Sequence, residues 1–214
     1  AAVFEETIST AQAVRFYDRL GRRHDWAERY EGRAKRRALQ LLDLAPGLRV
    51  LDVGTGTGFD HARIADAVRP GGLAAGLDLS TTMLAISGKR SDAPLVRADC
   101  RALPVATTSV DRVFSAYVLD LIPSSGIAVA LEEFHRVLRP GGLLALASLT
   151  DGVGPLSRTV MRLWTALYAR RPALLGGCRP VELTEPAEDA GFHVVSCEVV
   201  VQLGVPSEVL LARR

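Results

Sequence analysis

The stretch Val50–Gly58, with the sequence VLDVGTGTG, constrains the fold of this chain more than any other. Residues 50–53 form a short apolar run that is typical of a buried strand. Three glycines then follow at alternate positions, Gly54, Gly56 and Gly58. Glycine permits positive φ and lets a ligand approach bare backbone. The pattern predicts a strand, a sharp turn and a helix, with amide N–H groups at the carboxyl edge of a parallel sheet, where ligands bind.

The glycine spacing and the next strand together indicate which ligand the turn binds. A dinucleotide-binding loop needs a third glycine at position 59, which is Phe59 here, and no Lys-Ser/Thr pair of a P-loop follows. A second strand over 73–78 ends on Asp78, whose carboxylate can accept both hydroxyl hydrogens of a ribose. Ser80 stands where a helix N-cap is expected. These features favour a nucleoside ligand.

Strand and helix patterns alternate along the chain. Strands are expected at 48–53, 73–78, 94–98, 110–116 and 142–149, and helices at 59–68, 80–89 and 124–138. This alternation predicts an α/β fold, a parallel sheet with helices on both faces. Residues 9–44 are expected to be helical with breaks near Gly21 and Gly32, and the charges of Arg33, Lys35, Arg36 and Arg37 are expected on a solvated helix face. A helix near 180–190 and strands at 192–202 and 206–212 complete the chain.

Residues 151–179 interrupt the alternation. Pro155 can occupy the first turn of a helix. Five apolar residues then share one face at helical spacing, and four arginines frame them. The apolar residues are Leu156, Val160, Leu163, Trp164 and Leu167, and the arginines are Arg158, Arg162, Arg170 and Arg171. A lid over a substrate and a helix lying on a membrane surface both fit this pattern.

Length and composition limit the classes of function. A chain of 214 residues is expected to form one domain: an N-terminal helical lid (1–44), a core (45–150), a helical insertion (151–179) and a C-terminal helix with strands (180–214). A net charge of +2 argues against nucleic acid as a partner. Cys100, Cys178 and Cys197 form no C-x-x-C pair, so no metal site is expected. Sparse cysteines, no signal-peptide pattern and no apolar run of ~18 residues favour a cytoplasmic protein, peripheral to a membrane at most.

Four ordered blocks carry a resemblance to the class I S-adenosylmethionine-dependent methyltransferases. The blocks are Val50–Gly58, GLDLS at 76–80, RADCRALP at 97–104 and RVLRPGGL at 136–143. Within that family they look most like the ubiquinone/menaquinone-biosynthesis C-methyltransferases and the phospholipid N-methyltransferases. The resemblance implies a Rossmann-like seven-stranded sheet with the last strand antiparallel, and S-adenosylmethionine as cofactor, with S-adenosylhomocysteine as product.

The resemblance also implies roles for individual residues. Asp78 corresponds to the acid that binds the ribose, and Asp99 to the carboxylate that accepts from the adenine amino group. Leu79 and Met83 correspond to the apolar residues beside the adenine, and the backbone N–H of Cys100 faces its ring. The other expected cofactor contacts are Tyr17, Asp52, Gly54, Thr55, Gly56, Gly58 and Ser115. Tyr30, Tyr117 and Trp164 are expected to contact the substrate.

Methyl transfer to carbon or oxygen usually needs a base, whereas a nitrogen acceptor needs only its lone pair. The catalytic candidates are His24, Tyr117 and Asp120. For Asp120 a helix-capping role is an equal alternative. His61 is expected at the surface, with a contact to the glycine loop as the alternative, and His135 is expected to be solvated.

The favoured function is therefore methyl transfer to a small or lipid-like acceptor, either a quinone precursor or a phospholipid headgroup. A small-molecule O- or N-methyltransferase of secondary metabolism is the alternative, since the same core serves both. An NAD-dependent oxidoreductase and a non-catalytic cofactor-binding scaffold are weaker hypotheses. The acceptor, the base and the oligomeric state are left open by the sequence.

Overall fold

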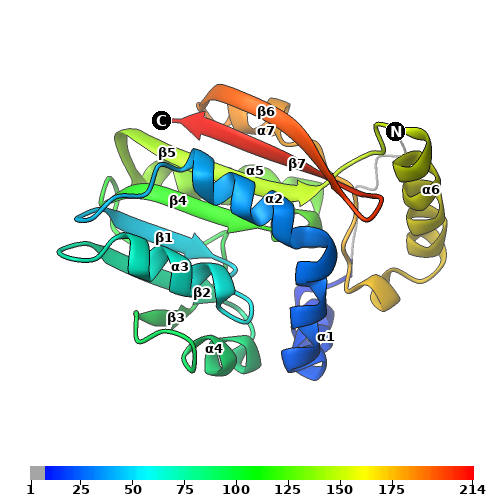
Figure 1. Cartoon of the computed structure of the whole chain (residues 1–214), viewed down its shortest axis with the longest axis horizontal. Coiled ribbons are helices and arrows are strands. Elements are labelled where there is room, and N and C mark those ends of the chain that lie inside the picture. Colours follow the sequence, from blue (N-terminus) through cyan, green and yellow to red (C-terminus); the bar gives the residue numbers. More distant parts are fainter. Residues whose placement is uncertain (1–7) are drawn as a thin grey trace.

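The computed structural model describes residues 8–214, in which seven strands form one sheet with helices on both faces (Figure 1). The strands are β1 (Arg49–Val53), β2 (Leu73–Asp78), β3 (Leu95–Arg97), β4 (Val110–Ala116), β5 (Leu138–Leu149), β6 (His193–Gln202) and β7 (Val205–Arg213). Their order is β3-β2-β1-β4-β5-β7-β6. The first five strands pair in parallel, and β7 runs antiparallel between β5 and β6. The predicted Rossmann-like sheet is confirmed.

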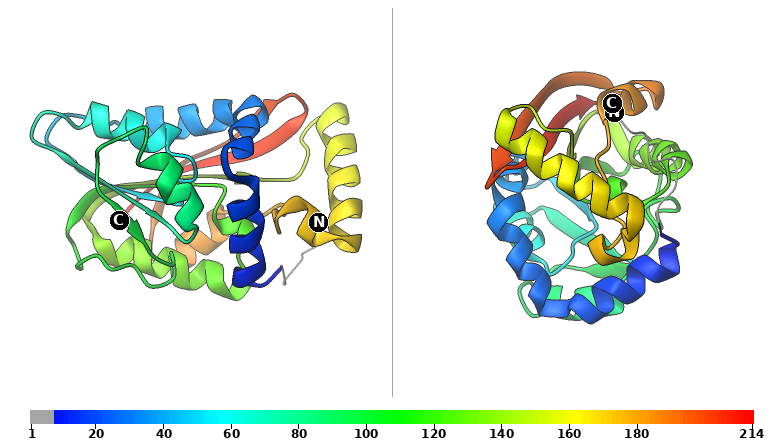
Figure 2. Two further views of the ribbon diagram at one scale, coloured as in Figure 1. Left: turned by 90° about the horizontal axis from the view of Figure 1, so that it is seen from below. Right: turned by 90° about the vertical axis from the view of Figure 1, so that its right-hand side faces the viewer.

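Helices cover both faces of the sheet and one of its ends. They are α1 (Thr10–Leu20), η1 (Gly21–Ala27), α2 (Glu28–Leu41), α3 (Phe59–Ala67), α4 (Thr81–Ser87), η2 (Leu119–Leu121), α5 (Ser124–Val137), α6 (Pro155–Arg170), η3 (Pro172–Leu175) and α7 (Thr184–Asp189). Helices α2 and α3 lie on one face and α5 on the other (Figure 2). Helices α1 and α6 stand at the end toward which the parallel strands point (Figures 1 and 2).

The alternation of side chains along the strands builds two cores. In β1, Leu51 and Val53 point to the face that α5 covers, whereas Val50 points to the face that α2 and α3 cover. Because successive side chains of a strand point to opposite faces, a strand with apolar residues on both sides needs helices on both faces of the sheet. The sheet is therefore rigid, and it fixes the strand ends that carry the loops described below.

Three sequence-based expectations about elements were wrong. The predicted break near Gly32 is absent, because α2 runs through it; a helical glycine costs only about 1 kcal/mol, which packing can offset. Strand β5 begins at Leu138, four residues early, since Leu138 pairs with Val110 before a bulge. Helix α7 is shorter than the segment 180–190. The expected break at Gly21 is confirmed, because η1 begins there.

Candidate active site

A cavity of about 510 Å³ lies at the carboxyl ends of β1, β2 and β4. Its wall comes from the glycine loop, the N-terminal helices, the loop after β4, and α6 with η3. Residues from the N-terminal helices, the glycine loop, the ends of β2 and β4 and the 151–179 insertion thus meet in one place, although they are far apart in the chain. The tertiary fold brings the N-terminal helices and the 151–179 insertion together at this cavity, where Gly176 lies against Phe16 and Tyr17.

The glycine loop is shaped by steric necessity. Gly54, Gly56 and Gly58 have φ of 80°, 52° and 88°, all in the region that side chains disfavour. A Cβ at Gly54 would lie 2.1 Å from Val118 Cγ2, and one at Gly58 2.3 Å from Ser87 Oγ. Gly54 and Gly56 line the cavity, whereas Gly58 packs against α4 outside it. The first two glycines therefore present bare backbone to the cavity, and the third positions the helix.

Asp78 connects the end of β2 to the glycine loop. Its Oδ2 accepts from the Gly56 N–H at 2.9 Å, and its Oδ1 accepts from the Ser80 N–H at 2.8 Å. Burial raises the pKa of this carboxyl, and the two backbone donors oppose that shift. Ser80 is the N-cap of α4, as predicted, because its Oγ accepts from the Met83 N–H. Asp78 lines the cavity, where its oxygens are within reach of a polyhydroxylated ligand.

Asp52 and His61 form a buried pair beneath the loop. The distance from His61 Nδ1 to Asp52 Oδ2 is 3.5 Å, and both side chains are almost completely buried. The expected surface position of His61 is wrong: α3 turns it inward, toward Gly76. Neither ring nitrogen has a hydrogen-bond partner among residues 8–214. His135 is likewise half-buried rather than solvated, because its ring packs edge-on against Phe192 at 5.1 Å.

Apolar residues line the part of the cavity next to the carboxyl end of β2. Leu79, Met83 and Cys100 line the cavity there, as the resemblance implied. Asp99 does not line it: its carboxylate is bound by Arg101 through two contacts, Nη2–Oδ2 at 2.6 Å and Nε–Oδ1 at 3.0 Å. Arg101 holds the pKa of Asp99 below its usual range. Asp99 can accept from a ligand in the cavity only if this pair rearranges.

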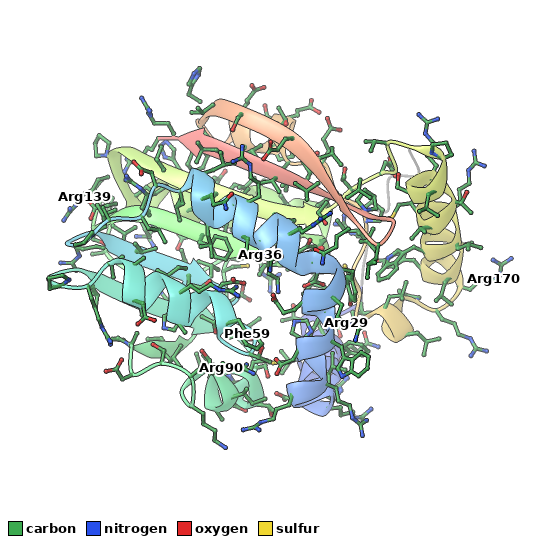
Figure 3. All side chains as sticks on the ribbon, in the orientation of Figure 1. Arg29, Arg36, Phe59, Arg90, Arg139 and Arg170 are labelled. Atoms are coloured by element: carbon green, nitrogen blue, oxygen red, sulfur yellow. The ribbon has the colours of Figure 1, made fainter. Side chains whose placement is uncertain are left out.

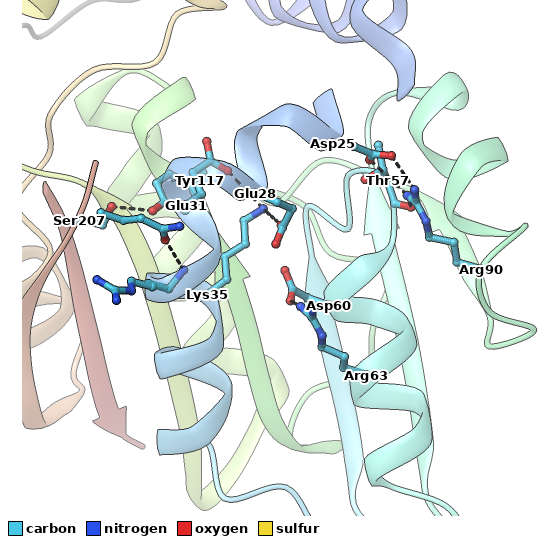
Figure 4. A network of polar contacts seen from close by, with 12 residues as sticks. Asp25, Glu28, Glu31, Lys35, Thr57, Asp60, Arg63, Arg90, Tyr117 and Ser207 are labelled. Carbon is cyan, nitrogen blue, oxygen red and sulfur yellow. Dashed lines mark hydrogen bonds and ion pairs between the residues drawn. The ribbon is translucent and has the colours of Figure 1, made fainter. Parts of the chain in front are cut away.

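A group of charged residues on α2, absent from the sequence-based prediction, forms another wall (Figure 4). Lys35 Nζ lies 2.8 Å from Glu28 Oε1 and 3.2 Å from Glu31 Oε2. The expectation that Lys35 lies on a solvated face was wrong, since only 12% of its side chain is exposed. Asp60, paired with Arg63 at 2.8 Å, adds a third carboxylate; it and Glu31 are buried, whereas Glu28 is half-buried. Burial raises the pKa of Glu31 and Asp60, and the carboxylates raise the pKa of Lys35.

Spacing in the sequence could have revealed this group. Glu28, Glu31 and Lys35 follow an i, i+3, i+7 pattern and continue the stripe of Ala38 and Leu42, which are both fully buried. Polar residues on the core-facing stripe of a helix indicate a polar cavity beneath it. The basic residues around Lys35 obscured that signal.

Aromatic side chains line the side of the cavity next to these charges. Tyr17 and His24 pack edge-to-face, with ring centroids 5.4 Å apart, and both line the cavity together with Tyr30. Burial and the Lys35 charge lower the pKa of His24 to about 4, so this imidazole is neutral at physiological pH. Burial raises the pKa of Tyr17 and Tyr30. Trp164, from α6, also lines the cavity, and its indole N–H donates to the Cys178 carbonyl at 3.0 Å.

Tyr117 occupies a strained position just after β4. Its φ is 57°, which is uncommon for a bulky residue and concentrates at functional sites. Its hydroxyl lies 2.6 Å from Ser207 Oγ, and Lys35 Nζ lies 5.8 Å from its ring centroid. Tyr117 lines the cavity, as expected. Ser115 does not: its buried hydroxyl donates to the Val53 carbonyl at 3.0 Å and links β4 to β1.

Asp120 lies completely buried behind the cavity wall. Its Oδ2 accepts from Cys178 Sγ at 3.2 Å and from the Leu149 N–H at 3.4 Å, while Oδ1 has no hydrogen-bond partner among residues 8–214. Burial raises the pKa of Asp120 to about 7. Cys178 itself lines the cavity. The thiol therefore separates Asp120 from the cavity, and a direct contact between Asp120 and a ligand needs Cys178 to move.

Residues 8–214 contain no group of three or more His, Cys, Asp or Glu side chains arranged to hold a metal ion. Within the same residues, every helix is too short or too polar to cross a bilayer.

Comparison with known proteins identifies the family. Residues 50–142 match the family model of a methyltransferase domain. A demethylmenaquinone methyltransferase of Corynebacterium urealyticum is 35% identical over 128 residues, covering 60% of this chain and 53% of the relative. A ubiquinone/menaquinone biosynthesis C-methyltransferase of Syntrophotalea carbinolica is 31% identical over 70% of this chain and 66% of its own length. A malonyl-[acyl-carrier protein] O-methyltransferase of Marinomonas sp. is 30% identical over 80% of this chain and 66% of its own length.

The chain spans about half the length of the demethylmenaquinone methyltransferase that it matches. Solved structures share the fold at lower sequence identity. A methyltransferase from Thermotoga maritima superimposes with a TM-score of 0.71 at 18% identity, covering 93% of this chain and 98% of the other. An S-adenosylmethionine-dependent methyltransferase from Aquifex aeolicus gives 0.63 at 21% identity, covering 94% and 97%.

Proposed function

Because this chain belongs to the class I S-adenosylmethionine-dependent methyltransferases, we propose that it transfers the methyl group of S-adenosylmethionine to a lipid-like acceptor that enters the cavity in a neutral or cationic form. A quinone precursor or a phospholipid headgroup is favoured. One observation carries the proposal: away from the glycine loop, the cavity combines an apolar wall with the carboxylates of Glu28, Glu31 and Asp60, and we assign this part of it to the acceptor. The apolar wall consists of Phe114, Leu121, Leu149, Trp164, Leu175 and Val205.

The residues around the glycine loop fit the cofactor. Gly54 and Gly56 leave the cavity open where a side chain would intrude, Asp78 can accept from ribose hydroxyls, and Leu79 and Met83 offer apolar surface to the adenine. Further contacts are proposed for Tyr17, Asp52, Thr55, Cys100 and Asp99, the last after release from Arg101. Neither Gly58 nor Ser115 lines the cavity. Gly58 instead shapes the glycine loop where it packs against α4, and Ser115 links β4 to β1. S-adenosylmethionine supplies an activated methyl group on a sulfonium, which the acceptor displaces in line.

The chain's own contribution is alignment, exclusion of water and proton transfer. Alignment can supply roughly 7–11 kcal/mol of the barrier. Burial under α1, α6 and η3 excludes water. An oxygen or carbon acceptor must also lose a proton. Glu31 is suited to take it, because its side chain lines the cavity, its Oε2 pairs with Lys35 Nζ at 3.2 Å, and burial raises its pKa. His24 remains neutral, but its low pKa makes it a weak base.

The relatives' names suggest several kinds of acceptor, and the charges on the cavity wall favour some of these over others. An O-methyltransferase acting on a malonyl group brings a carboxylate to the point of transfer. Here Glu28, Glu31 and Asp60 face one buried Lys35, with Arg63 on the outer side of Asp60. The carboxylate of such an acceptor would be a fourth at this place, and these three would repel it. This observation disfavours a malonyl acceptor.

The same charges favour an amine as a second candidate. Carboxylates attract an ammonium ion, and the faces of Tyr17, Tyr30 and Tyr117 can stabilise a cation nearby. An ammonium ion has no lone pair, so it must give its proton to water before it reacts. The neutral amine then attacks the methyl group, and this transfer step itself requires no base. A phospholipid amine headgroup would satisfy both the apolar wall and the carboxylates, whereas a water-soluble amine would use the carboxylates alone.

The test uses methyl-labelled S-adenosylmethionine with the purified protein and a cell extract separated into lipid and aqueous fractions. Label in the lipid fraction is expected, and chromatography then distinguishes labelled quinone from labelled phospholipid. Label confined to the aqueous fraction would contradict the lipid-like acceptor and support the small-molecule alternative. The Glu31→Gln variant serves as an internal comparison, because it should slow methylation of a quinol more than that of an amine.

A further inference from the structure

Besides the face that packs on the protein, helix α6 has an apolar face that is exposed. Ser157, Met161 and Tyr168 form its buried face. Leu156, Leu163 and Leu167 are spaced i, i+7 and i+11, so they align along another side of the helix. These leucines are 69%, 69% and 41% exposed. The sequence pattern placed them on one face with Val160 and Trp164, but the structure turns only the latter two toward the protein.

Exposed apolar residues from other segments continue this apolar face toward the cavity mouth. Leu203, at the tip of the β6–β7 hairpin, is 76% exposed, and its neighbour Gly204 lies against Leu156. Trp26 of η1 and Leu174 of η3 are exposed and also line the cavity. The view onto this end of the molecule shows α6, η3 and the hairpin tip together (Figure 2). We call Trp26, Leu156, Leu163, Leu167, Leu174 and Leu203 the end surface.

Arginines surround the end surface and lack acidic partners. Arg158, Arg162, Arg170 and Arg171 are exposed, and none forms an ion pair with any residue in 8–214. Arg170 projects outward from α6 (Figure 3). The Arg29 guanidinium lies over the Trp26 ring, 5.2 Å from its centroid. Elsewhere on the molecule many arginines pair with carboxylates, so this end has an uncompensated positive charge beside apolar side chains.

We propose that the end surface docks on an anionic lipid bilayer, with the cavity mouth against the lipid. Leucine side chains would enter the acyl boundary, Trp26 would lie at the polar–apolar interface, and the arginines would contact phosphate groups. A second copy of the chain fits this surface poorly, because it would bring the two arginine rims together. The inference goes beyond the proposed function, since docking requires neither cofactor nor acceptor. It would let a lipid-like acceptor enter the cavity directly from the bilayer.

Sedimentation with vesicles tests the proposal. The protein is expected to bind phosphatidylglycerol vesicles at least ~10-fold more tightly than phosphatidylcholine vesicles, with binding weakened by salt. Trp26 emission should shift to the blue on binding. The Leu163→Glu/Leu167→Glu variant should lose at least ~10-fold in vesicle affinity. Val129→Glu is the matched control, since Val129 is an exposed apolar residue on α5, and it should bind as the wild type does.

Three results would overturn docking: no binding of the wild type to phosphatidylglycerol, equal binding to both lipids, or unchanged binding by the double variant. Light scattering adds a further outcome. A dimer that the double variant loses, without vesicle binding, would assign the surface to a second copy. Calorimetric titration of S-adenosylmethionine in solution keeps the two proposals separate, because a protein that binds vesicles but not the cofactor would contradict the proposed function alone.

Discussion

Lys35 and Glu31 form a buried ion pair one turn apart on α2, with 3.2 Å between Nζ and Oε2. Glu28 binds the same ammonium at 2.8 Å. This arrangement places a positive charge, surrounded by carboxylates, on the cavity wall beside the strained Tyr117. It links the N-terminal helices to the part of the cavity that we assign to the acceptor, and it is the basis of the charge argument for that acceptor.

Removing the Lys35 charge should destabilise the fold. Lys35→Met leaves Glu28 and Glu31 without their shared cation, and an uncompensated buried charge costs roughly 3–5 kcal/mol. Urea unfolding measures the loss. Arg36→Met, on the exposed side of the same helix, should change the free energy of unfolding by less than about 0.5 kcal/mol. Equal stability of the two variants would mean that Lys35 is not needed to balance the carboxylates.

Replacing Asp120 should change the pH dependence of stability. The pKa of Asp120 is raised to about 7 by burial, so its contribution is fully present below the unfolded pKa near 3.8 and is lost as pH rises toward 7. The Asp120→Asn variant lacks this loss. Its stability relative to the wild type should therefore increase by roughly 4 kcal/mol between about pH 4 and pH 8. Denaturant unfolding at several pH values measures it, and a difference between the two proteins that does not change with pH would contradict the assignment.

The third glycine of the loop should be intolerant of substitution for a packing reason. Gly58 and Gly71 have φ of 88° and 85°, but a Cβ at Gly58 would meet the Ser87 backbone at 2.7 Å, whereas Gly71 has open space. Both alanine variants incur the cost of positive φ, about 1–2 kcal/mol. Gly58→Ala should lose about 1–3 kcal/mol more by overpacking. Similar melting temperatures for the two variants would refute the packing argument.

Asp78 should be needed for cofactor binding. Asp78→Asn removes the charge that would bind the ribose hydroxyls, and a lost charge-assisted hydrogen bond costs roughly 1.5–3 kcal/mol, or at least a tenfold loss in affinity. Calorimetric titration with S-adenosylhomocysteine measures this loss. Asp66→Asn, on the exposed side of α3, is the control and should bind normally. A melting temperature for each variant separates loss of the contact from loss of the fold, and unchanged affinity would remove Asp78 from the site.

Much of the fold could be predicted from local sequence, because strand and helix periodicity and the glycine spacing act over short distances. The run from Val50 to Gly58, Asp78 at the end of β2 and the N-cap Ser80 all follow from patterns within a few residues. The location of the cavity at the carboxyl edge of the sheet follows from the same patterns, because parallel strands align their ends.

Tertiary structure alone decided the environment of the charged residues. The sequence placed Lys35 in a basic stretch and His61 in a polar helix, yet both are buried, because which side of a helix meets the sheet depends on packing between distant segments. Asp99 and Ser115 show the converse, since Arg101 and the Val53 carbonyl hold their side chains off the cavity wall. The sequence by itself therefore determined the sheet and the glycine loop at its edge, whereas only the folded chain decided which charges line the cavity, because burial and charge pairing are properties of three-dimensional neighbours.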